Sequence, residues 1–125
     1  MNFRTVALAG LAVSIAAPAL AHHSFAMFDR EKSVTLTGVV KEFEWTNPHV
    51  WIHMMVPDSA GKPVEWSFEM QAVAAAMTGG WRANTVKPGD QITLVGHRVK
   101  GGANYINFSK IIFADGRELN PAIKN

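Results

Sequence analysis

Cysteine is absent from the 125 residues of this chain. Its absence excludes disulfide bonds, thiolate metal sites, iron–sulfur clusters, a cysteine nucleophile and a lipid-modified cysteine anchor. An excess of one charge is also lacking, because the chain has 12 basic and 10 acidic side chains. Arg4 lies in an expected export signal, and its removal would leave 11 basic side chains. Lys and Arg are spread singly along the chain, whereas nucleic-acid binders cluster them to neutralise phosphates. We therefore expect no nucleic-acid partner.

Long apolar runs are scarce as well. The one at residues 6–17 is shorter than the roughly 20 residues that span a bilayer. It follows Arg4 and precedes Ala19-Leu20-Ala21, which is the order of a secretory signal peptide with its cleavage site. We predict that residues 1–21 are a signal peptide cleaved after Ala21, with cleavage after Ala19 as the alternative. The mature protein is then periplasmic, begins at His22 and keeps no stable membrane anchor.

The composition, 48% hydrophobic and 18% charged, is typical of one compact domain. Segments rich in Val, Thr and aromatic residues, separated by Gly, Pro, Asn and Asp, indicate strands joined by turns. Five strands are expected at residues 34–45, 49–56, 64–69, 91–99 and 105–113, and a short alanine-rich helix at 70–77.

This order of elements matches a five-stranded Greek-key barrel of the OB-fold type, whose helix lies between the third and fourth strands. An open β-sandwich is the alternative. We predict an all-β, OB-like domain over residues 34–119, preceded by an N-terminal segment at 22–33 and followed by a tail at 120–125.

Gly38 lies where the apolar pattern of the first strand changes phase. Val34 and Leu36 have one parity, whereas Val39 and Phe43 have the other. A single register would therefore leave half of these side chains outside the core. A bulge or kink at Gly38 would bring all of them inside.

A set of short motifs extends over nearly the whole mature chain. They are His22-His23-Ser24-Phe25, Leu36-Thr37-Gly38-x-Val40, Trp45-x-Asn47-Pro48-His49-x-Trp51, Trp66-x-Phe68-Glu69, Gly80-Trp81, Lys87-Pro88-Gly89-Asp90 and Asp115-Gly116-Arg117-x-Leu119. Together they resemble a family of short exported bacterial proteins known only as a domain of unknown function. The resemblance implies export and a small β-rich domain. It transfers no catalytic residue, because the family has none assigned.

The expected mature start suggests a metal-binding terminus. His22 would carry both a free α-amine and an imidazole, a pair that chelates Cu(II), and His23 adds a second ring. A third nitrogen could come from His49, His53 or His97, as in the histidine brace of other exported copper proteins. Copper is therefore the cofactor that these residues suggest. The alternative is that the terminal histidines are solvated and bind nothing.

His49 and His53 share one strand parity, but they would lie roughly 13 Å apart along an extended chain. They cannot ligate one ion unless the backbone bends. The second expected ligand surface is aromatic, because small barrels of this type stack sugars and bases on exposed rings. Its candidate residues are Trp45, Asn47, Trp51, Trp81 and Tyr105, and the alternative is that the tryptophans pack in the barrel wall.

Paired carboxylates raise a third alternative, a small hydrolase. Glu65 and Glu69 lie on one expected strand, and glycoside hydrolysis needs two carboxylates that flank the scissile bond. Alternation instead indicates that they lie on the solvent face, and the chain has no nucleophile elbow or phosphate loop. We therefore expect a non-enzymatic module that binds a metal ion or small ligand, with the protein partner open.

Overall fold

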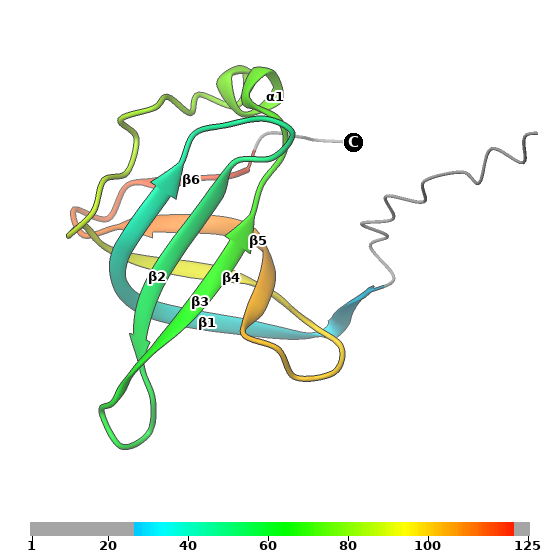
Figure 1. The fold of residues 1–125 in the computed structure, drawn as a ribbon, viewed down its shortest axis with the longest axis vertical. Helices are drawn as coiled ribbons and strands as arrows, with labels where there is room; N and C mark the ends of the chain where they lie inside the picture. The colour runs from blue at the N-terminus through cyan, green and yellow to red at the C-terminus, as the bar shows by residue number, and fades with distance from the viewer. Residues whose placement is uncertain (1–26, 122–125) are drawn as a thin grey trace, which may run out of the picture.

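The computed structural model describes residues 27–121, so the expected signal peptide and the candidate ligands His22 and His23 lie outside the described residues. This part of the chain holds six strands and one short helix (Figure 1). In chain order they are β1 (Phe28–Glu44), β2 (Trp51–Pro57), β3 (Pro63–Glu69), α1 (Val73–Thr78), β4 (Gln91–Val99), β5 (Tyr105–Phe113) and β6 (Glu118–Leu119).

The strands form one sheet in the order β3-β2-β1-β4-β5-β6, in which neighbours are antiparallel. β3 also pairs with β5, in parallel, through residues 67–69 and 105–107. This pairing closes a ring of hydrogen bonds through five strands (Figure 1). The expectation of a mostly β domain with a short helix between the third and fourth strands is confirmed. Within residues 27–121, no helix has the length and apolar character needed to cross a membrane.

β1 is long enough to pair with two neighbouring strands. Its residues up to Val39 pair with β4, and those from Val39 onward pair with β2. The bulge that was expected at Gly38 lies at Lys41, where the register with β2 shifts. Val39 remains 46% exposed, so the expectation that it enters the core is wrong. The strand also begins at Phe28 rather than at residue 34, and the Phe28 side chain is buried.

Gly38 instead allows a close approach between β1 and β2. A Cβ atom at this position would lie 2.2 Å from the carbonyl oxygen of Met55. Gly96 in β4 has the same role against β5, because its Cβ would lie 2.4 Å from the carbonyl oxygen of Asn107. Glycine therefore lets the backbones approach at two places in the sheet.

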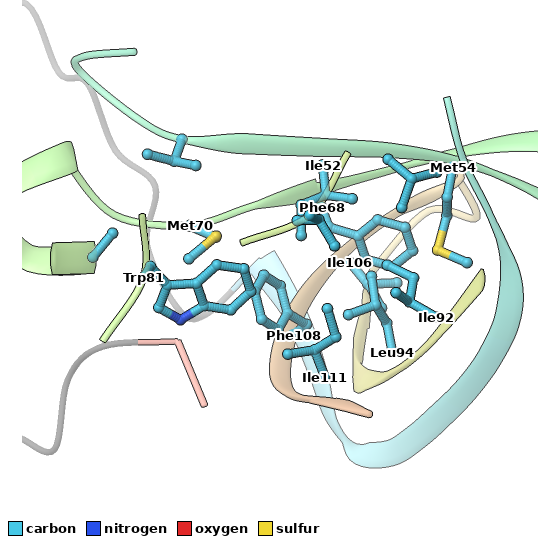
Figure 2. Close-up of a cluster of buried hydrophobic side chains, with 14 of the residues drawn as sticks. Ile52, Met54, Phe68, Met70, Trp81, Ile92, Leu94, Ile106, Phe108 and Ile111 are labelled. Atoms are coloured by element: carbon cyan, nitrogen blue, oxygen red, sulfur yellow. The ribbon is translucent and has the colours of Figure 1, made fainter. Parts of the chain in front are cut away.

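The core fills the space enclosed by the sheet, and alternate residues of each strand point into it (Figure 2). Trp81, which follows α1, closes one end of the core and packs edge-on against Phe108 at 5.9 Å between ring centroids. Its indole N–H donates a 2.8 Å hydrogen bond to the carbonyl of Asn120. The buried side chains include Ile52, Met54, Phe68, Met70, Trp81, Ile92, Leu94, Ile106, Phe108 and Ile111.

Candidate functional site

The outer side of β2, β3 and β5 carries a group of aromatic and polar side chains. Alternation along β2 turns its even-numbered residues into the core and leaves Trp51 and His53 outside. The register with β3 places Glu69 opposite Trp51 and Ser67 opposite His53. The parallel pairing with β5 then places Tyr105 beside Ser67. We call this set the aromatic face: Trp51, His53, Ser67, Glu69 and Tyr105.

Glu69 is the centre of a buried polar cluster on this face. It is 7% exposed and is the one buried charged side chain of residues 27–121. One carboxylate oxygen accepts a hydrogen bond from the Tyr105 hydroxyl, and the other contacts Nδ1 of His49. A buried carboxylate is costly unless polar partners surround it, which explains why these groups come together. The sequence placed Glu69 on a solvated face, but pairing with β5 encloses it.

Tyr105 is held in its neutral form by this arrangement. Burial, the hydrogen bond to Glu69 and the charge of that carboxylate all raise the pKa of Tyr105 above its ordinary value of 10.0. The ring of Phe28 packs edge-on against it, with 5.4 Å between centroids. The phenol therefore remains a hydrogen-bond donor at neutral pH.

Trp51 lies between two other rings. Its ring plane is within 7° of that of His53, with centroids 6.1 Å apart, and it meets Tyr105 at 33° and 5.6 Å. The Trp51 side chain is half-buried rather than part of the core. The three rings form an aromatic row on the outside of the sheet.

His53 is fixed through both of its ring nitrogens. Nδ1 lies 2.9 Å from the hydroxyl oxygen of Ser67, and Nε2 lies 3.0 Å from a carboxylate oxygen of Glu44. A carboxylate oxygen of Glu65 is 3.9 Å from Nδ1. A metal ion at His53 would therefore have to displace a hydrogen bond. These contacts set the ring parallel to Trp51.

Lys41 and Glu65 form an exposed ion pair beside the aromatic face, with 2.6 Å between nitrogen and oxygen. Their hydrogen bond raises the pKa of Lys41 and lowers the pKa of Glu65. Glu65 and Glu69, the two carboxylates that could have formed a hydrolytic pair, thus contact different groups.

The candidate metal residues do not gather in one place. His49 precedes β2 and contacts Glu69, whereas His53 contacts Glu44 and Ser67. In the described part of the chain, no three His, Asp or Glu side chains are arranged to hold a metal ion.

The remaining ligand candidates, Trp45, Asn47 and Trp81, pack in the fold or cap the helix. Trp45 is partly buried and packs against the core, and its ring lies 5.7 Å from that of Phe43. The side-chain oxygen of Asn47 accepts a 3.0 Å hydrogen bond from the backbone N–H of Val73, at the start of α1. Trp81 is fully buried, so it offers no surface to a ligand. The structure therefore leaves Trp51 and Tyr105 as the aromatic candidates.

Ser67 and Phe28 contact the candidate residues of this face, although neither was expected there from the sequence. Ser67 has the same strand parity as Glu65 and Glu69, and this signal could have placed it on their face. Phe28 lies in a segment of mixed character that gave no strand signal. Its place against Tyr105 depends on β1 beginning earlier than expected.

The fold and the site define a small, mostly β protein with an aromatic and carboxylate-bearing face. The chain belongs to the family described as "Family of unknown function (DUF6152)", whose model matches residues 10–106. This match confirms the resemblance inferred from the motifs. No curated protein and no solved structure matches the chain.

Proposed function

We propose that this protein is an exported, non-enzymatic binding protein of the periplasm that receives a small ligand on its aromatic face. The observation that carries the proposal is the position of Trp51, half-buried between His53 and Tyr105 outside the core. Large aromatic side chains held outside a core in fixed orientation are typical of ligand-binding surfaces. The expected signal peptide at residues 1–21 supports export.

We further propose that the ring of five strands is an OB-like barrel. The strand order, the parallel pairing of β3 with β5 and the position of α1 between β3 and β4 support this. OB-folds bind oligosaccharides and oligonucleotides on the face of their second and third strands. Trp51 and Glu69 lie on the corresponding strands of this chain.

A sugar ring is the neutral ligand that fits this surface best. Its apolar face would stack on Trp51, and polar groups at its edge would meet Glu69 and the neighbouring Asn107, which is in register with Glu69 on β5. A non-enzymatic role is favoured because Glu65 and Glu69 are engaged by Lys41 and by Tyr105. Hydrolysis would require both carboxylates at one scissile bond.

The test is a titration of the mature protein with cellohexaose and with chitohexaose, followed through the indole N–H signals in NMR spectra. We expect the Trp51 signal to shift, and Trp51→Ala to weaken binding by roughly ten- to hundredfold, since ring stacking contributes about 1–3 kcal/mol. Trp45 packs against the core, so Trp45→Phe is the matched control and should bind normally. Equal binding by the wild type and Trp51→Ala would overturn the proposal.

Copper is the second candidate ligand, and the contact between Glu69 and His49 favours it. Carboxylates orient metal-binding histidines through the ring nitrogen that does not bind the metal. Nδ1 of His49 faces Glu69, so a metal would bind through Nε2. The described chain begins beside this cluster, since Phe28 packs on Tyr105. The six residues from His22 to Met27 can extend at most about 20 Å.

Copper binding is tested with CuSO₄ and the mature protein, with its N-terminus sequenced first. We expect Cu(II) binding to weaken in two variants, one with an extra alanine before His22 and the other His49→Ala. His97→Ala is the matched control, because His97 lies on β4 and its nearest hydrogen-bond partner is the carbonyl of Lys32. Binding that is equally weak in all four proteins would rule out this ligand.

A further inference from the structure

Trp51 has a glutamate directly opposite it on both neighbouring strands. The register between β1 and β2 pairs it with Glu44, and the register between β2 and β3 pairs it with Glu69. Side chains of directly opposed residues lie on the same face, with Cβ atoms about 4.5–5.5 Å apart. The aromatic row is therefore flanked by carboxylates on its two long sides.

Two carboxylates of β1 lie beside the rings. Glu42 is opposite His53, and Glu44 is opposite Trp51. No lysine or arginine of residues 27–121 forms an ion pair with either of them, although His53 contacts Glu44. Lys41, the nearest basic residue in sequence, pairs with Glu65 instead.

This local charge contrasts with the near balance of the whole chain. Four of its ten acidic side chains border the aromatic row, and the other six are distributed over the rest of the chain. The four are Glu42, Glu44, Glu65 and Glu69. Negative charge around rings that lie outside the core favours a positively charged ligand, because the ring face and the carboxylates attract the same cation.

We propose that the aromatic face binds an organic ammonium ion, which lies over Trp51 between Glu44 and Glu69. The inference rests on the proposed function, since it names the ligand class of the same face. Indole has the strongest ring quadrupole among the side chains, and it attracts an ammonium group within about 6 Å of its centroid. A cationic headgroup is attracted by the rings and by the charge of the carboxylates together, whereas a neutral sugar can stack and form hydrogen bonds but lacks the charge attraction.

The test compares two probes of the same shape. Choline carries a permanent positive charge, and 3,3-dimethylbutan-1-ol has a neutral carbon in place of its nitrogen. The mature protein is titrated with each and followed through the Trp51 indole signal. We expect choline to bind roughly tenfold more tightly than the alcohol, which corresponds to the usual strength of a partly desolvated cation–π contact. The preference should fall as salt is added.

Variants separate the contributions of ring and charge. Trp51→Ala should abolish binding of choline. Glu44→Gln should weaken binding of choline and leave binding of the alcohol unchanged. Glu118→Gln, a carboxylate on β6, is the matched control and should bind as the wild type does.

The outcomes also separate this inference from the proposed function. Equal, Trp51-dependent binding of both probes would overturn the ammonium inference and leave the aromatic ligand face standing. Binding of neither probe would overturn the inference as well, and the oligosaccharide titration would then decide the proposed function alone. Preference for choline that survives in Glu44→Gln at every salt concentration would contradict the role given to charge.

Discussion

The hydroxyl of Tyr105 on β5 donates a hydrogen bond to the buried carboxylate of Glu69 on β3. The bond spans the parallel pairing that closes the ring of strands, so it should stabilise that closure. We expect Glu69→Gln to lower the free energy of unfolding by about 1–3 kcal/mol, and Tyr105→Phe by about 1 kcal/mol. Urea unfolding of both variants and of the double variant gives the coupling between them. Additive losses would contradict a direct interaction.

Tyr105 should also make the protein sensitive to alkali. Its pKa is raised in the folded state, so the folded protein holds this proton more tightly than the unfolded chain does. The resulting stability is complete below the ordinary pKa of 10.0 and is lost as the pH rises above it towards the folded value. We expect wild-type stability to fall more steeply than that of Tyr105→Phe between pH 9 and pH 11 in urea unfolding. Parallel curves would show that the phenol does not contribute.

Asn47 should act in folding rather than in ligand binding. Its side-chain oxygen accepts the N–H of Val73 at the first turn of α1, where the residue that precedes the helix provides no side-chain cap. We expect Asn47→Ala to lower the melting temperature through a loss of about 0.5–2 kcal/mol, as for other helix caps. Asn47→Asp keeps the acceptor and should lose much less. A binding defect at unchanged stability would instead assign Asn47 to the ligand site.

Gly38 should not tolerate even a methyl group. Its φ is not positive, so an alanine would be strained only by contact, with Cβ 2.2 Å from the carbonyl oxygen of Met55. We expect Gly38→Ala to lower the free energy of unfolding by about 1–3 kcal/mol, the usual cost of overpacking. Thr35→Ala, an exposed position on the same strand, is the control and should change stability by about 0.5 kcal/mol or less.

The strands with clear alternation and clear turns could be predicted from the sequence. β4 and β5 have the expected bounds, Gln91–Val99 and Tyr105–Phe113, because Gly and Pro mark the turns next to them. β1 was expected to be shorter, since its first residues are mostly polar and exposed. They are in a strand because β4 pairs with Phe28 and again from Ser33 onward, which is a tertiary effect that local pattern does not reveal.

The site was predictable residue by residue but not as an arrangement. Trp51, Glu69 and Tyr105 were each noted for their chemistry, yet their contact depends on two strand registers and on a parallel pairing between distant segments. Trp81 was also selected as a ligand candidate, but it is buried. The sequence alone does not distinguish a tryptophan that fills the core from one that faces a ligand. Burial was decided by its place after α1, against Phe108.

The closed ring of hydrogen bonds limits how another protein chain can attach to residues 27–121. β-Strand addition requires a free sheet edge, and here β2 and β4 each have a neighbour on both sides, whereas residues 28–38 of β1 pair with β4 alone and β6 pairs with β5 alone. β3 and β5 are joined to each other near Glu69. A partner that extends the backbone ladder would therefore have to add to β6 or to the first part of β1, and at β2 and β4 it would have to recognise side chains. The same closure reduces the length of sheet edge that is open to edge-to-edge association between copies of the protein.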